Sequence, residues 1–241
     1  MNNNQSKKVT VQDIAALANV SVATVSRALS KPDKVSEKTR AVVMKAVEET
    51  GYTINEAARN LRRQQTDTIV IMVPNIGNPV FSNVVEGIEN ICAANDISVL
   101  IADTQKASMS PEKARSYFSQ NRVDGIIILD GLMPLDVISY GKKIPTIVFA
   151  GEWNDKSDLP TVRINDESGI GLAVDHLFNL GHRKIGQVSG PLTHTPGKAR
   201  FDGFNQAVDD LDCRSTSTWC FEGDFSLESG AIAAKVWYEL P

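Results

Sequence analysis

From residue 68 onward, short apolar runs of strand type alternate with segments of helical periodicity. The runs are TIVIMV, ISVLIAD, VDGIIIL, IPTIVFA, PTVRIN and KIGQVSG, and the expected helices lie at 79–94, after Pro111, at 167–180, 199–211 and 227–239. Strands that are apolar throughout and separated by helices are typical of parallel sheets covered on both faces. The sequence therefore predicts an α/β, doubly wound body. The polar stretch WNDKSDLP (153–160) interrupts the series and indicates a crossing between two subdomains.

The first fifty residues follow a different pattern, that of three short helices. Thr10 and Asp13 have the spacing of a capping box. Ser21 and Ser36 can cap the second and third helices, and Gly51 is a residue type favoured just after a helix ends. Because only NVS separates the first two helices, this layout predicts a helix-turn-helix.

Charge is divided unevenly along the chain. Residues 1–65 hold 11 Lys and Arg against 6 Asp and Glu, a charge of +5, whereas the remainder carries −9 and the whole chain −4. A basic end on an acidic body suggests that the basic region binds phosphate groups while the acidic body has a separate function. A solvated basic face without a partner is the alternative that charge alone leaves open.

The composition is typical of a cytoplasmic protein. No apolar run reaches the length of roughly 18–20 residues that crosses a bilayer, and the polar start MNNNQSKK is unlike a signal peptide. The three cysteines (Cys92, Cys213 and Cys220) are odd in number and lack CxxC spacing. We therefore expect reduced thiols, without a disulfide framework, a metal site or a membrane partner.

The second helix carries an unusual set of outward residues. Val25 and Ala28 recur at helical spacing and should face inward. The residues left for the outer face are Val22, Ala23, Thr24, Ser26 and Arg27. In a helix-turn-helix the second helix lies in the major groove, where an arginine can contact guanine and small apolar groups can meet thymine methyl groups. A three-helix packing module without DNA would show the same periodicity, so periodicity does not decide between the two.

The run VSxATVSRAL…VSxxTR…GY within residues 9–63 resembles the headpiece of the LacI/GalR family of bacterial repressors. VPNIGNPVFSNVVEGIE, RVDGIIIL, HLFNLGHRKIGQVSGP and ARFDGF match the family's effector-binding body in order. Within the family, ATVSRALSKPDKVS, VFAGEW and LPTVRIND look most like the cytidine-responsive members. The resemblance implies a repressor that binds a pseudo-palindromic operator in double-stranded DNA as a homodimer and is controlled by a small effector, a nucleoside or a sugar.

The resemblance also implies a division of the chain. We expect a helix-turn-helix headpiece at 1–54, a hinge helix and linker at 55–67, a first effector-binding subdomain at 68–160 and a second at 161–241. The body should have a periplasmic-binding-protein-like fold. We expect its second subdomain to be incomplete, because family members continue beyond the segment that matches the last residues of this chain.

Further DNA-contacting positions follow from the resemblance alone. In the family, the segment matching NEAARNLRR forms a hinge helix in the minor groove, which implies roles for Asn55, Ala58 and Leu61. Leu61 would wedge between central base pairs and kink the duplex. The remaining positions stand where the family contacts the DNA backbone, and they are Thr10, Ser30, Ser36, Thr39 and Tyr52. For the hinge segment, a plain linker is the alternative.

Four residues are candidates for effector binding. Arg200, in ARFDGF, matches the arginine that family members point at the effector, although it could also be a surface arginine on a helix. Asn75 and Phe81 follow the first strand, at the edge where open α/β sheets bind ligands. His194 is near Arg200 in the sequence and could line the same cleft, or it could be a solvated loop histidine. Sugar-binding members often keep an acid where this chain has Ala150 and Gly151, which favours a nucleoside.

Enzymatic functions find little support in the sequence. GPLTHTPGKA lacks the glycine and the Ser or Thr of a phosphate-binding loop, since Leu192 and Ala199 occupy those positions. There is no GxGxxG after a strand, no GxSxG and no HExxH. We therefore expect no catalytic residues, no cofactor and no enzymatic activity. A small-molecule-binding module of periplasmic-binding-protein type, without DNA function, is the alternative to a regulator.

Overall fold

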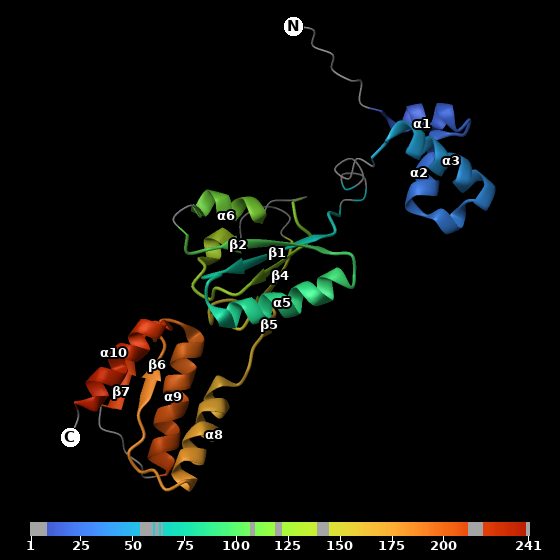
Figure 1. Ribbon diagram of the computed structural model, residues 1–241. Coiled ribbons are helices and arrows are strands. Elements are labelled where there is room, and N and C mark those ends of the chain that lie inside the picture. Colours follow the sequence, from blue (N-terminus) through green and yellow to red (C-terminus); the bar gives the residue numbers. More distant parts are fainter. Residues whose placement is uncertain are drawn as a thin grey trace. The chain divides into compact units, whose positions relative to one another are not determined.

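The structure is a computed structural model. It describes residues 9–53, 60, 63, 65–106, 109–118, 122–138, 145–211 and 219–239. The chain divides into two compact units, Met1–Arg63 and Gln64–Pro241, and each is described by itself. Figure 1 labels their helices and strands.

The first unit is a bundle of three short helices. They are α1 (Val11–Leu17), α2 (Val22–Ser30) and α3 (Glu37–Thr50), with a 3₁₀ turn η1 (Pro32–Lys34) between the last two. The backbone N–H of Thr10 donates to Oδ2 of Asp13 at 2.8 Å, and the N–H of Asp13 donates back to Oγ1 of Thr10, which confirms the predicted capping box.

The other predicted helix ends are confirmed as well. The hydroxyl of Ser21 accepts the N–H of Thr24, and that of Ser36 accepts the N–H of Thr39. Gly51 ends α3 in the left-handed conformation, with φ of 61°. These caps fix where each helix begins and ends.

A small apolar core holds the three helices together. Its buried members come from all three helices and the C-cap of α1, and they are Ile14, Ala15, Ala18, Val25, Ala28, Val43 and Ala46. The alanines keep the side chains short, so helices of only two to four turns can approach closely. Val25 and Ala28 of α2 point into this core, which leaves the opposite face of α2 free.

The second unit opens with a five-stranded sheet in which all neighbouring pairs run parallel. Its strands are β1 (Thr68–Val73), β2 (Ser98–Asp103), β3 (Gly125–Ile128), β4 (Thr146–Ala150) and β5 (Thr161–Val162), in the spatial order β2-β1-β3-β4-β5. The chain order is broken at β1, which lies between β2 and β3, so the winding reverses there. Since β5 pairs with β4, residues on both sides of position 160 belong to this sheet.

Helices cover both faces of the sheet (Figure 1). On one face Val70 and Met72 pack with residues of α6 (Pro111–Tyr117) and α7 (Leu135–Ile138). On the other, Ile71 and Val73 pack with residues of α5 (Pro79–Ala93). Successive side chains of a strand point to opposite faces, so an unbroken apolar strand fills two cores. The doubly wound α/β prediction is confirmed.

The chain then forms a second group of helices and strands within the same unit, with a core of its own. It contains α8 (Asp166–Asn179), α9 (Thr195–Asp210), α10 (Leu227–Tyr238) and the parallel pair β6 (Gln187–Ser189) and β7 (Cys220–Glu222). Val174, Ile185, Phe204 and Val208 form its buried core. β7 was missed in the sequence because it is three residues long and no apolar run marks it.

The helices α8 and α9 lie side by side (Figure 1), and a glycine permits their close approach. A Cβ at Gly203 would lie 2.7 Å from both the Cα and the carbonyl oxygen of Glu167. Only a residue without a side chain fits at this crossing. Across the described residues of both units, no helix is long and apolar enough to cross a membrane.

Candidate DNA-binding and effector-binding sites

The outward face of α2 is the first candidate site. Val22, Ala23 and Arg27 are exposed, while Thr24 and Ser26 are half-buried. The first turn of α2 has no acidic residue, and Arg27 stands near its last turn. A helix of this kind can lie against the negative charge of a DNA groove without repulsion.

Several predicted backbone-contacting residues act first as local caps. The Ser36 and Thr39 hydroxyls lie 2.8 Å apart at the start of α3, and Thr10 is bonded to Asp13. The Ser30 hydroxyl donates to the Ser26 carbonyl at 2.7 Å. Tyr52 packs against the apolar core of the headpiece. The predicted hinge contacts Asn55, Ala58 and Leu61 lie outside the residues that the structure describes.

A cavity of about 700 Å³ in the second unit is the second candidate site. It opens at the carboxyl ends of the strands, since Pro74 follows β1, Leu129 follows β3 and Ala150 ends β4. This is the edge at which open parallel sheets bind ligands. Its volume and its mixture of apolar walls with a few polar groups are those of a small-molecule site. We call it the strand-end cavity.

The structure brings all four predicted effector residues to this cavity. Asn75, Phe81, His194 and Arg200 line it, although they come from two segments of the chain that are more than 100 residues apart. Oδ1 of Asn75 accepts the N–H of Gly77 at 2.9 Å, which shapes the loop after β1. The Arg200 side chain is 41% exposed and its Nε donates to Oδ1 of Asp166 at 2.7 Å. Arg200 is therefore held by a partner and is not a loose surface arginine.

His194 is not the solvated loop histidine that the sequence left open. Its side chain is 13% exposed, and its Nδ1 lies 3.0 Å from Oε1 of Glu152. Glu152 is buried and also accepts the backbone N–H of Gly131 at 3.0 Å. Beside this pair, the Thr195 hydroxyl donates to the Trp153 carbonyl at 2.8 Å. The segment after β4 and the start of α9 are thus joined by two polar contacts.

The lining residues that were not predicted from the sequence include Glu152, Asp166 and Phe225. Phe225 has a φ of 65°, which is uncommon for a residue with a bulky side chain. Its ring lies edge-on to the His194 ring at 5.9 Å. Its ring carbons would be 2.0 Å from a Cβ at Gly190, so the ring occupies this position only while residue 190 has no side chain. The pattern GDFSLES, a turn before a capped helix, was the available signal.

The rim of the cavity carries a fixed negative charge. Hydrogen bonds from the side chain and then the backbone of Ser226 lower the pKa of Asp224 from 3.8 to about 2. Asp224 lines the cavity and stays ionised at neutral pH. Its carboxylate can accept a hydrogen bond from a ligand, and Arg163 and Arg200 line the same cavity.

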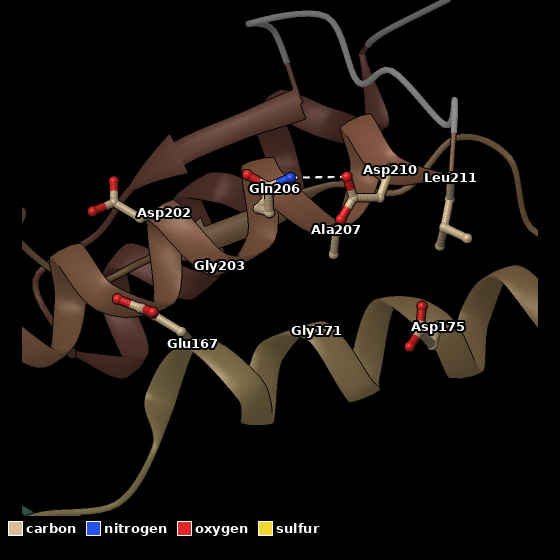
Figure 2. Close-up of a pocket in the computed structure, with 9 residues that line it drawn as sticks. All are labelled: Glu167, Gly171, Asp175, Asp202, Gly203, Gln206, Ala207, Asp210 and Leu211. Atoms are coloured by element: carbon tan, nitrogen blue, oxygen red, sulfur yellow. Dashed lines mark hydrogen bonds between the residues drawn. The ribbon is translucent and has the colours of Figure 1, made fainter.

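A second hollow of about 420 Å³ lies along α8 and α9 (Figure 2). Its carboxylates are those of Glu167, Asp175, Asp202 and Asp210. Asp210 accepts the side-chain N–H of Gln206 at 2.8 Å. Among the described residues no three His, Cys, Asp or Glu side chains are grouped to hold a metal ion. We call this hollow the α8–α9 groove.

Comparison with known proteins assigns both units to one family. Residues 10–55 match the model of bacterial regulatory proteins of the lacI family, and residues 66–241 match that of periplasmic binding proteins and the sugar binding domain of the LacI family. The chain belongs to the LacI family. It is a DNA-binding transcriptional regulator with a helix-turn-helix headpiece and an effector-binding body.

Individual relatives agree with this assignment. The transcriptional repressor CytR of Escherichia coli (strain K12) is 34% identical over 98% of this chain and 70% of its own length. The repressor PurR of Aliivibrio salmonicida (strain LFI1238) is 31% identical, over 94% of this chain and 68% of its own. A lac repressor dimer bound to operator and the anti-inducer ONPF superposes with a TM-score of 0.77 at 28% identity, covering 93% of this chain and 68% of that one. The headpiece match leaves a binding module without DNA function unsupported.

Proposed function

We propose that this LacI-family chain represses transcription by binding a pseudo-palindromic operator as a homodimer, and that a nucleoside in the strand-end cavity controls the binding. The observation that carries the proposal is the exposed face of α2, with Val22, Ala23 and Arg27 outward on a helix anchored by Val25 and Ala28. Arg27 supplies a bidentate contact to guanine, while Val22 and Ala23 meet thymine methyl groups.

An apolar surface on the second unit supports the homodimer. β2 is an edge strand of the sheet, and its Leu100 and Ile101 are each 45% exposed. Ile91, on the neighbouring helix α5, is 69% exposed. Exposed apolar residues beside an unpaired strand edge are costly in a monomer and are commonly covered by another chain. Two headpieces held by such a dimer would read the two halves of a palindrome.

Effector control follows from the composition of the strand-end cavity. Its walls come from the strand ends of the first sheet and from the start of α9. Two residue pairs connect these walls: Glu152 with His194, and Trp153 with Thr195. A ligand shifts the regulator between two states only by binding one of them more tightly. All the groups named here bind or orient, so the proposed function contains no catalytic step and needs no cofactor. A regulator of bacterial operators acts in the cytoplasm, which is the proposed location.

Fluorescence anisotropy of the full chain tests this function. Three labelled duplexes are compared across salt concentrations: a palindromic operator, a single half-site and a scrambled sequence. We expect tight, salt-dependent binding to the palindrome, weaker binding to the half-site, and a change in affinity when cytidine or adenosine is added. Equal affinity for all three duplexes would refute sequence-specific recognition, and equal affinity for palindrome and half-site would refute the homodimer.

A further inference from the structure

One carboxylate of the strand-end cavity has incomplete hydrogen bonding. Asp166 is the first residue of α8, and its side chain is only 3% exposed. Its Oδ1 accepts Nε–H of Arg200 at 2.7 Å, but its Oδ2 is buried and has no hydrogen-bond partner among the described residues. Folded proteins rarely leave a buried carboxylate oxygen unpaired, because the desolvation of that oxygen is then uncompensated.

A hydrogen-bond donor bound in the cavity would supply the missing partner. A carboxylate oxygen beside a guanidinium accepts hydrogen bonds, and the Nε–H of Arg200 is already taken by Oδ1. Asp166 lines the cavity, so a ligand there can reach it. A hydroxyl group is a donor of suitable size and charge.

Arg200 defines a second contact next to the first. Among the described residues, its guanidinium is hydrogen-bonded through Nε alone, which leaves both Nη groups for a ligand. These groups only donate, so they need an oxygen acceptor. Because Arg200 and Asp166 are bonded to each other, the free acceptor and the free donors are neighbours. Two adjacent hydroxyls on one ring match this arrangement, one donating to Oδ2 and the other accepting from Arg200.

We propose that Asp166 is a specificity-determining residue that selects effectors carrying a vicinal diol, such as the 2′,3′-diol of a ribonucleoside, in which the 2′-hydroxyl donates to Oδ2 of Asp166 and the 3′-hydroxyl accepts from Arg200. The inference rests on the proposed role of the cavity as the effector site. It adds the reason why a ribonucleoside is preferred over the same base on deoxyribose, which lacks one of the two hydroxyls.

Isothermal titration calorimetry on the full chain tests the inference with four probes: cytidine, adenosine and their 2′-deoxy counterparts. We expect the parent to bind the ribonucleosides about tenfold or more tightly, the effect of one hydrogen bond to a charged group. Asp166→Asn keeps an oxygen for Arg200 but replaces the other acceptor with a donor. It should weaken ribonucleoside binding and leave deoxynucleoside binding nearly unchanged, so the ratio of the two affinities falls toward one.

Asp175→Asn is the matched control. Asp175 lies on the same helix, loses the same charge, and lines the α8–α9 groove, not the cavity (Figure 2). It should retain the full preference for the ribose forms. Arg200→Gln removes the guanidinium that holds Oδ1 of Asp166, so Asp166 is no longer oriented toward the 2′-hydroxyl and the ribose preference should also fall. This variant provides a second test if Asp166→Asn folds poorly.

The outcomes separate the two proposals. A ribose preference that Asp166→Asn and Arg200→Gln leave unchanged would overturn the inference while the cavity remains an effector site, and so would equal binding of ribose and deoxyribose forms by the parent. If the parent binds none of the four nucleosides, the nucleoside effector itself is refuted and the inference falls with it. A purely structural role of Asp166 would lower the melting temperature but would not change the ratio of affinities.

Discussion

Replacing Gly203 by alanine should destabilise the second unit although alanine favours helices. A Cβ there would lie 2.7 Å from the Cα and carbonyl oxygen of Glu167 and 2.8 Å from Cγ2 of Ile170. Ordinary contacts of this kind lie at 3.4–4 Å, and two of the three atoms are backbone, so α8 itself must move away from α9. Figure 2 shows Gly203 facing α8 near Glu167.

The size of the effect follows from two opposed contributions. Overpacking of this kind costs about 1–3 kcal/mol. The better helix propensity of alanine offsets about 1 kcal/mol of that cost. We therefore expect a net loss of about 1–2 kcal/mol, because a backbone obstacle places the packing cost at the upper end of its range. For a domain the size of the second unit, this lowers the melting temperature by about 2–8 °C.

Tryptophan fluorescence during thermal unfolding measures this loss in the second unit alone, since all three tryptophans (Trp153, Trp219 and Trp237) follow residue 64. The matched control is Gly171→Ala in the interior of α8, where an added Cβ meets nothing within 4 Å. That variant should be more stable than the parent by about 0.5–1 kcal/mol. The free energy of unfolding should therefore fall in Gly203→Ala and rise in Gly171→Ala. A Gly203→Ala variant at least as stable as the parent would refute the close-packing argument.

Three further substitutions test the DNA and effector sites. Arg27→Ala should remove about 1–3 kcal/mol of discrimination between operator and scrambled DNA in an anisotropy assay; an unchanged preference would count against base contact by Arg27. Leu61→Ala should weaken operator binding and reduce DNA bending, measured by energy transfer between labelled duplex ends, and bending equal to that of the parent would exclude a wedge. Gly190→Ala should displace the Phe225 ring, which lies 2.0 Å from the added Cβ, and weaken nucleoside binding by calorimetry. Unaltered affinity would show that Phe225 does not contact the ligand.

Local rules allowed the helices and the central strands to be predicted. The caps at Thr10, Ser21 and Ser36 each depend on a residue three positions away, so the sequence displays both partners. The strands β1 to β4 are apolar enough to be recognised singly. The beginning of α9 was placed four residues late, because His194 caps the helix without a side-chain hydrogen bond and Pro196 in the first turn was not recognised as a start signal.

The cavity was harder to predict because its contacts join distant parts of the chain. Glu152 meets His194 across 42 positions, and Asp166 meets Arg200 across 34. A single carboxylate in the sequence gives no indication of its partner, so Glu152 and Asp166 could not be distinguished from solvated acids. Arg200 and Phe81 were found through the family resemblance and the strand-end rule. Phe225 was missed because it follows the short strand β7.

The first two turns of α9 concentrate the polar contacts of the cavity. His194 meets Glu152, Thr195 meets Trp153, and Arg200 meets Asp166, so three contacts depend on the position of one helix. Because Gly203 fixes the spacing of α9 and α8 a few residues further along, any shift of α9 changes all three contacts together. In the proposed function, a ligand bound to Arg200 and Asp166 would also shift the contacts of His194 and Thr195, because all of them depend on the position of α9. We expect Gly203→Ala to weaken nucleoside binding as well as stability, whereas Gly171→Ala should leave binding unchanged, and calorimetry on both variants measures that coupling.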